Sequence, residues 1–162
     1  MIREVRLQDA KQICSIYNYH VTNTIVTFEE EPVTENEMKQ RITTTTKKFP
    51  WLVYEEKDLI AGYAYASQWR TRSAYRYAAE TTVYIGEEFT GKGIGTVLYK
   101  QLIEDMKELS FHSLIGGIAL PNDASISLHE KLSFKKVAHF EQVGFKMNRW
   151  VDVGYWELLL NY

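Results

Sequence analysis

The sequence predicts a mixed α/β protein in which strands precede, separate and follow the helices. Apolar periodicity along the 162 residues gives the order β-α-α-β-β-β-α-β-α-β-β. In the second half, strands lead directly into helices, which is typical of mixed α/β folds. No Gly/Ser-rich linker or shift in composition divides the chain, so we expect a single domain over residues 1–162.

Each expected element depends on its apolar spacing and on the residues at its ends. Alternation of apolar and polar side chains predicts strands, and recurrence every three to four residues predicts helices. Asp9 is expected to cap the first helix, and Thr34 with Glu37 has the spacing of a capping box before the second. The expected strands lie at residues 2–7, 51–56, 59–65, 80–85, 114–120, 136–143 and 151–160, and the expected helices at residues 10–21, 34–47, 93–109 and 124–132.

Composition excludes several classes of function. Nineteen Lys and Arg against twenty-one Asp and Glu give a net charge of −2, so we expect no nucleic-acid partner. The apolar runs are shorter than the roughly 20 residues of a membrane span, and the N-terminus has no apolar signal region, so we expect neither membrane insertion nor secretion. The one cysteine, Cys14, favours a reducing, cytoplasmic setting and is expected to be a small buried hydrophobe. The histidines at 20, 112 and 139 lack metal-ligand spacing, so we expect no metal.

A glycine-rich turn follows the strand at residues 80–85 and precedes a helix. Its sequence is Thr90-Gly91-Lys92-Gly93-Ile94-Gly95. Backbone amides at a helix N-terminus attract an anion, and glycines let a phosphate approach the backbone closely. The alternative is a packing or capping turn. Neither the Walker pattern nor the dinucleotide fingerprint fits, because no Gly-Lys-Ser/Thr closes the turn and position 96 is Thr.

The turn resembles the coenzyme A pyrophosphate loop of the GNAT superfamily of N-acetyltransferases, with Thr90 standing where that family usually has Arg or Gln. The resemblance covers nearly the whole chain and is most specific to the phosphinothricin and methionine-sulfoximine acetyltransferases. The matching segments are residues 16–18, 24–29, 50–53, 69–75, 80–84, 120–125, 128–130 and 150–156. It implies a central, mostly antiparallel sheet with a splayed central strand pair and flanking helices, acetyl-CoA as co-substrate and a homodimer.

Two residues are candidates for proton transfer. Glu80 opens an otherwise uncharged strand immediately before the turn, and the family places its general base at the matching glutamate. The alternatives for Glu80 are a solvated carboxylate or a partner of Arg76. His129 lies on a short helix and resembles a catalytic histidine of this branch, although a lone helical histidine is usually structural.

Further residues are candidates for binding the cofactor and the amine substrate. Asn122 has the spacing of a helix N-cap, which is a purely structural role, and the resemblance also assigns it a hydrogen bond to the pantetheine arm. An open strand edge can pair with pantetheine amides as with another strand. The cofactor candidates are Val83, Tyr84, Ile85, Thr90, Gly91, Lys92, Gly93, Ile94, Gly95, Asn122 and Ser125, and the substrate candidates by resemblance are Phe28, Arg70, Arg72 and Tyr75.

The expected reaction is acetyl-CoA-dependent N-acetylation of a small amino acid or analogue of the phosphinothricin, methionine sulfoximine or methionine sulfone type. The arginines of residues 69–76 favour an acidic substrate, because a guanidinium matches an oxyanion. A solvated basic loop is the alternative interpretation of that segment. Two other functions stay open: a CoA-binding module without turnover, and an acetyltransferase for a protein or polyamine amine.

Overall fold

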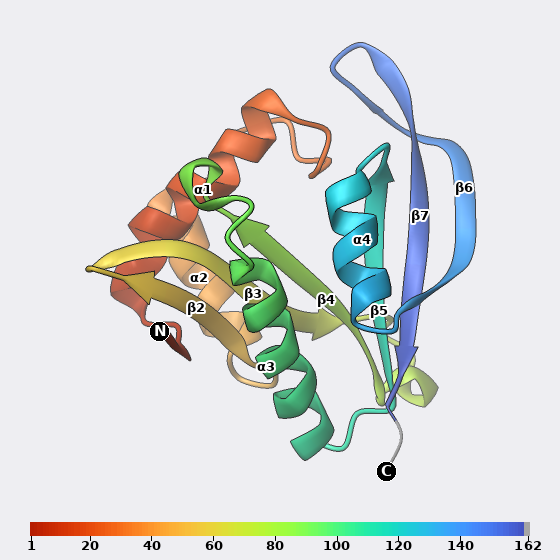
Figure 1. The fold of residues 1–162 in the computed structure, drawn as a ribbon, viewed down its shortest axis with the longest axis horizontal. Helices are drawn as coiled ribbons and strands as arrows, with labels where there is room; N and C mark the ends of the chain where they lie inside the picture. The colour runs from red at the N-terminus through yellow and green to blue at the C-terminus, as the bar shows by residue number, and fades with distance from the viewer. Residues whose placement is uncertain (161–162) are drawn as a thin grey trace.

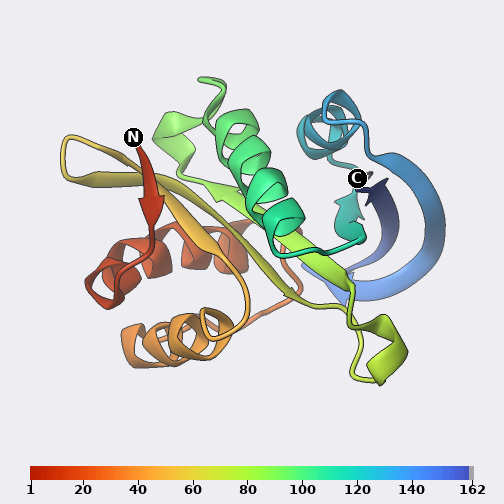
Figure 2. The same ribbon diagram turned by 90° about the horizontal axis from the view of Figure 1, so that it is seen from below.

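The computed structural model describes residues 1–160, and its elements form one seven-stranded sheet with helices on both faces (Figures 1 and 2). Residues 161 and 162, the end of the expected domain, lie outside the described residues. The strands are β1 (Ile2–Glu4), β2 (Trp51–Glu56), β3 (Leu59–Gln68), β4 (Ala78–Ile85), β5 (Ser113–Leu120), β6 (Lys135–Lys146) and β7 (Arg149–Leu159). The helices are α1 (Ala10–Asn23), α2 (Glu35–Thr45), α3 (Ile94–Glu108) and α4 (Asp123–Lys131), with 3₁₀ turns η1 (Leu7–Asp9), η2 (Ser73–Tyr75) and η3 (Glu87–Phe89).

The strand order is β1-β2-β3-β4-β5-β7-β6, and one neighbouring pair differs from the rest. β4 and β5 are parallel, whereas the other neighbouring pairs are antiparallel. The β4–β5 register covers only residues 78–80 against 113–115. Beyond Glu80 the two strands separate, as the widening angle between them in Figure 1 shows. The expected mostly antiparallel sheet with a splayed central pair is therefore confirmed.

Two apolar cores hold the helices against the sheet. α3 and α4 cover one face, and α1 and α2 cover the other (Figure 2). Three members of the apolar stripe expected along residues 93–109 are fully buried, namely Leu98, Leu102 and Met106, whereas the fourth, Leu109, is exposed at the C-cap of α3. On the opposite face, Ile13 of α1 is fully buried. The central strands are therefore packed on both faces.

The N-terminal strand is shorter than predicted. β1 ends at Glu4, and a 3₁₀ turn replaces the expected continuation. Asp9 is the N-cap residue of α1 as predicted, but its side chain makes no capping hydrogen bond to that helix. Its carboxylate instead accepts a hydrogen bond from the Arg6 amide at 2.7 Å and two from the Arg3 guanidinium at 2.8 and 2.9 Å. A buried carboxylate takes the strongest donors within reach, and a charged guanidinium is stronger than a helix amide.

The capping prediction for the second helix holds in part. Thr34 accepts a hydrogen bond from the Glu37 amide at 3.1 Å. The Glu37 carboxylate does not reach back as a capping box requires, because it pairs with Arg41 one turn later at 2.8 Å. Among the helices of residues 1–160, none is long and apolar enough to cross a membrane.

Candidate active site

A cavity of about 270 Å³ opens where β4 and β5 separate. Strands, a helix and a loop far apart in sequence all contribute to it. The lining comes from β4 (residues 80–84), β5 (117–119), α4 with its cap (Asn122, Ser125 and His129), the loop after α1 (26–28) and β7 (Val153 and Tyr155). The structure thereby brings together both proton-transfer candidates, one substrate candidate, Phe28, and four cofactor candidates, Val83, Tyr84, Asn122 and Ser125.

Two consecutive glycines of β5 allow both proton-transfer candidates to approach this strand. A Cβ at Gly116 would overlap the His129 ring. A Cβ at Gly117 would lie 3.1 Å from the Tyr155 ring and 3.7 Å from Glu80 Oε1. Consecutive residues of a strand face opposite sides of a sheet. Glu80 and His129 therefore reach the cavity from opposite faces, and the gap between the strands connects them.

Glu80 is half-buried on β4 at the last paired position before the splay. Burial raises the pKa of this carboxyl, and the positive charge of Arg70 opposes the rise. The alternative partner, Arg76, instead stacks on Tyr77, with its guanidinium carbon 4.7 Å from the ring centre. A carboxylate whose pKa is shifted toward neutrality is suited to accept a proton near pH 7.

His129 is buried, with 4% of its surface exposed, and both ring nitrogens have partners. Nδ1 lies 2.7 Å from the Ser125 carbonyl oxygen, which only accepts, so Nδ1 carries the proton. Nε2 then accepts from the Tyr99 hydroxyl at 2.9 Å, and the Thr81 hydroxyl in turn donates to the Tyr99 oxygen at 2.5 Å. Burial lowers the pKa of His129. The imidazole is therefore neutral and linked to the strand bearing Glu80 through two hydroxyls.

The glycine-rich turn forms a second cavity of about 350 Å³ at the N-terminus of α3. Gly91 and Gly93 have φ of +77° and +78°, and Gly93 is the N-cap. A Cβ at either glycine would meet no heavy atom within 4 Å, so the space over the backbone is open. The first amides of a helix have no intrahelical partner and favour an anion. The residues present therefore fit the pyrophosphate of coenzyme A.

The other cofactor candidates lie around these two cavities. Asn122 is confirmed as the N-cap of α4, where its side chain accepts from the Ser125 amide at 3.1 Å. Residues 83–85 follow the end of the β4–β5 pairing, so their edge of β4 faces the gap. The Lys92 ammonium lies 5.1 Å from the centre of the Phe89 ring. Lys131, which sequence reasoning missed, lines the glycine cavity from α4.

The substrate candidates are divided by the structure. Phe28 lines the cavity, and Arg70 stacks on Trp69 with its guanidinium carbon 4.3 Å from the ring centre. Trp69 in turn packs edge-on against Tyr155 of the cavity wall at 5.6 Å. Arg72 and Tyr75 lie at η2 with exposed side chains. Arg70 is exposed as well, and none of these three candidates is among the residues that line the cavity.

Tyr155 is a further lining residue that sequence reasoning missed. Period-two alternation in this aromatic-rich segment predicts a strand but does not say which face of β7 meets a cavity. The β5–β7 register places Tyr155 beside Gly117, the residue that also faces Glu80. If the pairing of β5 with β7 were known, a glycine opposite a large aromatic side chain would indicate that this side chain faces the cavity.

Comparison with known proteins agrees with this geometry. Residues 2–154 match the family model for the acetyltransferase (GNAT) domain. The L-methionine sulfoximine/L-methionine sulfone acetyltransferase of Salmonella typhimurium is 34% identical over 99% of this chain and 94% of its own length. The phosphinothricin acetyltransferase structure from Sinorhizobium meliloti with acetyl-CoA is 36% identical, with a TM-score of 0.96 over 99% of this chain and 88% of its own.

A third similar protein carries a different substrate in its name. The structure of ribosomal-protein-alanine N-acetyltransferase from Brucella melitensis is 34% identical, with a TM-score of 0.97 over 99% of each chain. The three proteins share a reaction class and differ in the named amine. Family match, whole-length relatives and the splayed sheet lead to one conclusion: the chain belongs to the GNAT family and is an N-acetyltransferase.

Proposed function

We propose that this enzyme transfers the acetyl group of acetyl-CoA to the α-amino group of a small amino acid or analogue of the phosphinothricin, methionine sulfoximine or methionine sulfone type. The observation behind the proposal is a half-buried Glu80 with a raised pKa at the point where β4 and β5 separate. A cavity of about 270 Å³ there suits an amino acid-sized acceptor, and the names of the relatives supply the substrate class.

Cofactor binding is assigned to the glycine turn, the open edge of β4 and the cap of α4. Acetyl-CoA would supply an acyl carbon activated as a thioester. The amides of residues 90–95 hold its pyrophosphate, the backbone of residues 83–85 pairs with the pantetheine arm, and Asn122 with Ser125 limits that arm on the opposite side of the gap. Lys131 adds positive charge to the pyrophosphate site. No metal takes part in the proposed reaction.

Glu80 acts as general base. The ammonium of an amino acid is mostly protonated at neutral pH, and only the free amine attacks a carbonyl. Glu80 takes that proton, directly or through one water, and the amine nitrogen then bonds to the acyl carbon while the carbon–sulfur bond breaks. Burial supports this role because a raised pKa keeps the carboxylate basic near pH 7.

His129 assists from the other face of the sheet. Its Nε2 is the only basic atom of the ring, and it is bound to the Tyr99 hydroxyl rather than exposed in the cavity. We assign to it the proton that the amine nitrogen loses as the amide forms: His129 takes it up through the hydroxyls of Thr81 and Tyr99 and returns it along the same path to the leaving sulfur. The imidazolium formed in this way is short-lived, because burial lowers the pKa of His129 and favours release of the proton.

Arg70 and Phe28 are assigned to substrate recognition. The positive charge of Arg70 is close enough to Glu80 to lower the pKa of that carboxyl. We therefore assign to Arg70 the orientation of the acidic group of an amino acid whose amine faces Glu80. Phe28 covers the aliphatic portion. Arg72 and Tyr75 remain substrate candidates by resemblance, on an exposed turn at the end of β3.

The β6–β7 hairpin is proposed as the surface of a homodimer. Its large exposed apolar side chains have exposed fractions between 50% and 63%, and they are Val137, Phe140, Val143, Phe145, Met147 and Trp150. Several large exposed apolar side chains on one hairpin are typical of an interface. Sedimentation should show a dimer, and a monomer would refute this part.

We further propose a single domain over residues 1–162 and a cytoplasmic setting. The free, buried Cys14 supports the cytoplasmic setting.

An assay of thiol release from acetyl-CoA with a panel of amines tests the function. The panel contains methionine sulfoximine, methionine sulfone, phosphinothricin, a polyamine and a peptide with N-terminal alanine. We expect turnover with at least one of the first three. Turnover only with the peptide or polyamine would assign the enzyme to the rival amine classes, and binding of acetyl-CoA without turnover would leave a CoA-binding module.

A further inference from the structure

We propose that Lys146 is a positioning residue that holds the substrate wall formed by residues 26–28. The inference depends on the proposed function, because it concerns the amino-acid side of the same cavity. Val26, Thr27 and Phe28 line that cavity, yet the segment between α1 and α2 is neither helix nor strand. Its conformation must therefore come from side chains that bind it from outside.

Lys146 binds this segment from the end of β6. Only 3% of its surface is exposed, although lysine is rarely buried. Its ammonium donates to the Thr27 carbonyl oxygen at 2.7 Å and to the His20 carbonyl oxygen at 3.4 Å. No carboxylate of the described residues lies within ion-pair distance of it. Glu29 and Glu30 favour its positive charge from beyond ion-pair distance. The hydrogen bonds that replace the hydration of this buried ammonium are therefore the two to the carbonyl oxygens.

A glycine two residues earlier completes the contact. A Cβ at Gly144 would overlap the ring of Phe28, so this position of β6 must lack a side chain for Phe28 to lie where it does. Gly144 and Lys146 point to the same face of the strand, because they are two residues apart. The strand therefore fixes the segment twice, through the Phe28 ring and through the Thr27 carbonyl.

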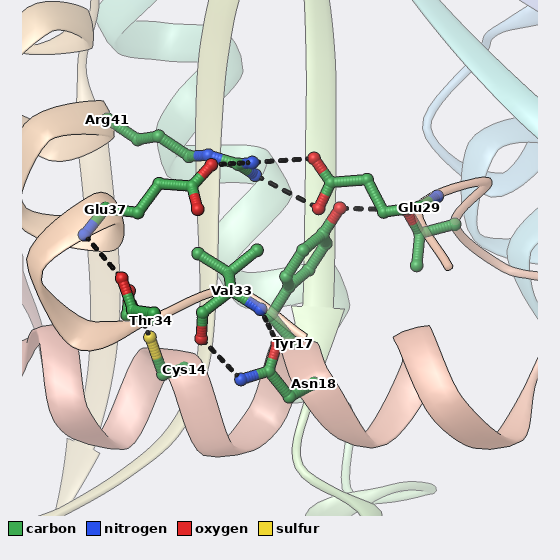
Figure 3. Close-up of polar contacts among 9 residues, drawn as sticks. Cys14, Tyr17, Asn18, Glu29, Val33, Thr34, Glu37 and Arg41 are labelled. Atoms are coloured by element: carbon green, nitrogen blue, oxygen red, sulfur yellow. Dashed lines mark hydrogen bonds and ion pairs between the residues drawn. The ribbon is translucent and has the colours of Figure 1, made fainter. Parts of the chain in front are cut away.

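Residues of α1 and α2 also bind the segment between these helices (Figure 3). The Tyr17 hydroxyl lies 2.9 Å from Thr27 Oγ1, and Arg41 makes two hydrogen bonds to the Glu29 carboxylate at 2.7 and 3.2 Å. Asn18 makes two hydrogen bonds to the Val33 backbone, both at 2.8 Å. These contacts anchor the segment to α1 and α2, whereas Lys146 alone among the charged residues of β6 and β7 donates to its backbone.

The consequence for catalysis is specific to the amino acid. Without the ammonium, the wall loses its tie to β6 and samples conformations in which Phe28 does not cover the substrate. The apparent affinity for the amino acid falls in proportion to the fraction of molecules whose wall stays in the competent conformation. The loss of one charge-assisted hydrogen bond should lower that affinity about tenfold. The glycine turn and the edge of β4 are not contacted by Lys146, so the affinity for acetyl-CoA should not change.

The test compares Lys146→Met with Lys135→Met, a change at an exposed lysine of the same strand. We expect Lys146→Met to raise the KM for methionine sulfoximine by about tenfold, to leave the acetyl-CoA Kd unchanged and to speed amide hydrogen exchange in residues 24–33. Lys135→Met should match the wild type in all three. An unchanged KM, or equal losses for both substrates, would overturn the proposal.

Gly144→Ala tests the same wall with the ammonium in place, and it decides the question if Lys146→Met does not fold. It should raise the amino-acid KM by displacing Phe28, with acetyl-CoA binding again unchanged. A wild-type KM in a folded Gly144→Ala enzyme would contradict the positioning role. If the wild type acetylates no amino acid, the proposed function fails. Exchange in residues 24–33 then decides alone, and unchanged exchange in Lys146→Met would refute the contact.

Discussion

The glycine turn offers a prediction in which backbone strain and anion repulsion can be separated. Gly93 has φ of +78° and open space where a Cβ would project, so Gly93→Ala costs only the left-handed conformation, about 1 kcal/mol. Gly93→Asp has the same cost and also places a carboxylate where the pyrophosphate is expected. Acetyl-CoA at 100 times its Kd should stabilise the wild type by about 2.7 kcal/mol, which is roughly 5–11 °C in Tm for a chain of this size.

Differential scanning fluorimetry with and without acetyl-CoA measures these shifts. Gly93→Ala should have a lower Tm without ligand and keep a large part of the ligand-induced shift. Gly93→Asp should have a similar starting Tm and lose that shift. If Gly93→Asp retains the full acetyl-CoA shift, the anion does not bind at this turn and the assignment of residues 90–95 is refuted.

Three further predictions concern the substrate, the proton path and stability. Arg70→Ala should raise the amino-acid KM about tenfold and more than Arg72→Ala does, with the acetyl-CoA KM unchanged in steady-state assays. Tyr99→Phe removes the donor to a buried imidazole, so unfolding in urea should show a loss of about 1–3 kcal/mol together with a lower kcat. Arg3→Met leaves the carboxylate of Asp9 buried and unpaired, which should cost about 3 kcal/mol at pH 7. Burial raises the pKa of Asp9, but hydrogen bonds from Arg3 and a backbone amide outweigh it, and the net pKa is lowered. The stabilisation is therefore present above pH 3.8, the usual value, and is lost as pH falls through the lowered pKa, so denaturation curves of wild type and variant should converge in acid.

The sequence predicted those features that depend on residues close together in the chain, such as helix caps. Asn122 has the spacing of an N-cap and is one. Asp9 shows the limit of such rules, since a guanidinium six residues away outcompeted the helix amides for its carboxylate.

The parts of the site that sequence could not predict are contacts between distant residues. His129 and Tyr99 are thirty positions apart, and no periodicity links them. Tyr155 reaches the cavity because β7 pairs beside β5, which is a matter of strand order. Lys131 faces the glycine turn only because α3 and α4 cover the same face of the sheet. Residue type identifies chemistry, whereas topology decides which groups meet.

The measurement that tests the central claim most directly is the pH–rate profile of Glu80→Gln beside that of the wild type. Gln keeps the shape and a hydrogen bond but cannot accept the proton, so kcat near pH 7 should fall about 10²–10⁴-fold, with acetyl-CoA binding intact. The deficit should shrink as pH rises, because solvent then deprotonates more of the amine. In the wild type, the rate should fall on the acid side at a higher pH than the pKa of an ordinary glutamate would give, since burial raises the pKa of Glu80. A Glu80→Gln enzyme with near-wild-type kcat at pH 7, or a pH-dependent deficit found only in His129→Ala, would contradict the assignment of Glu80 as the base.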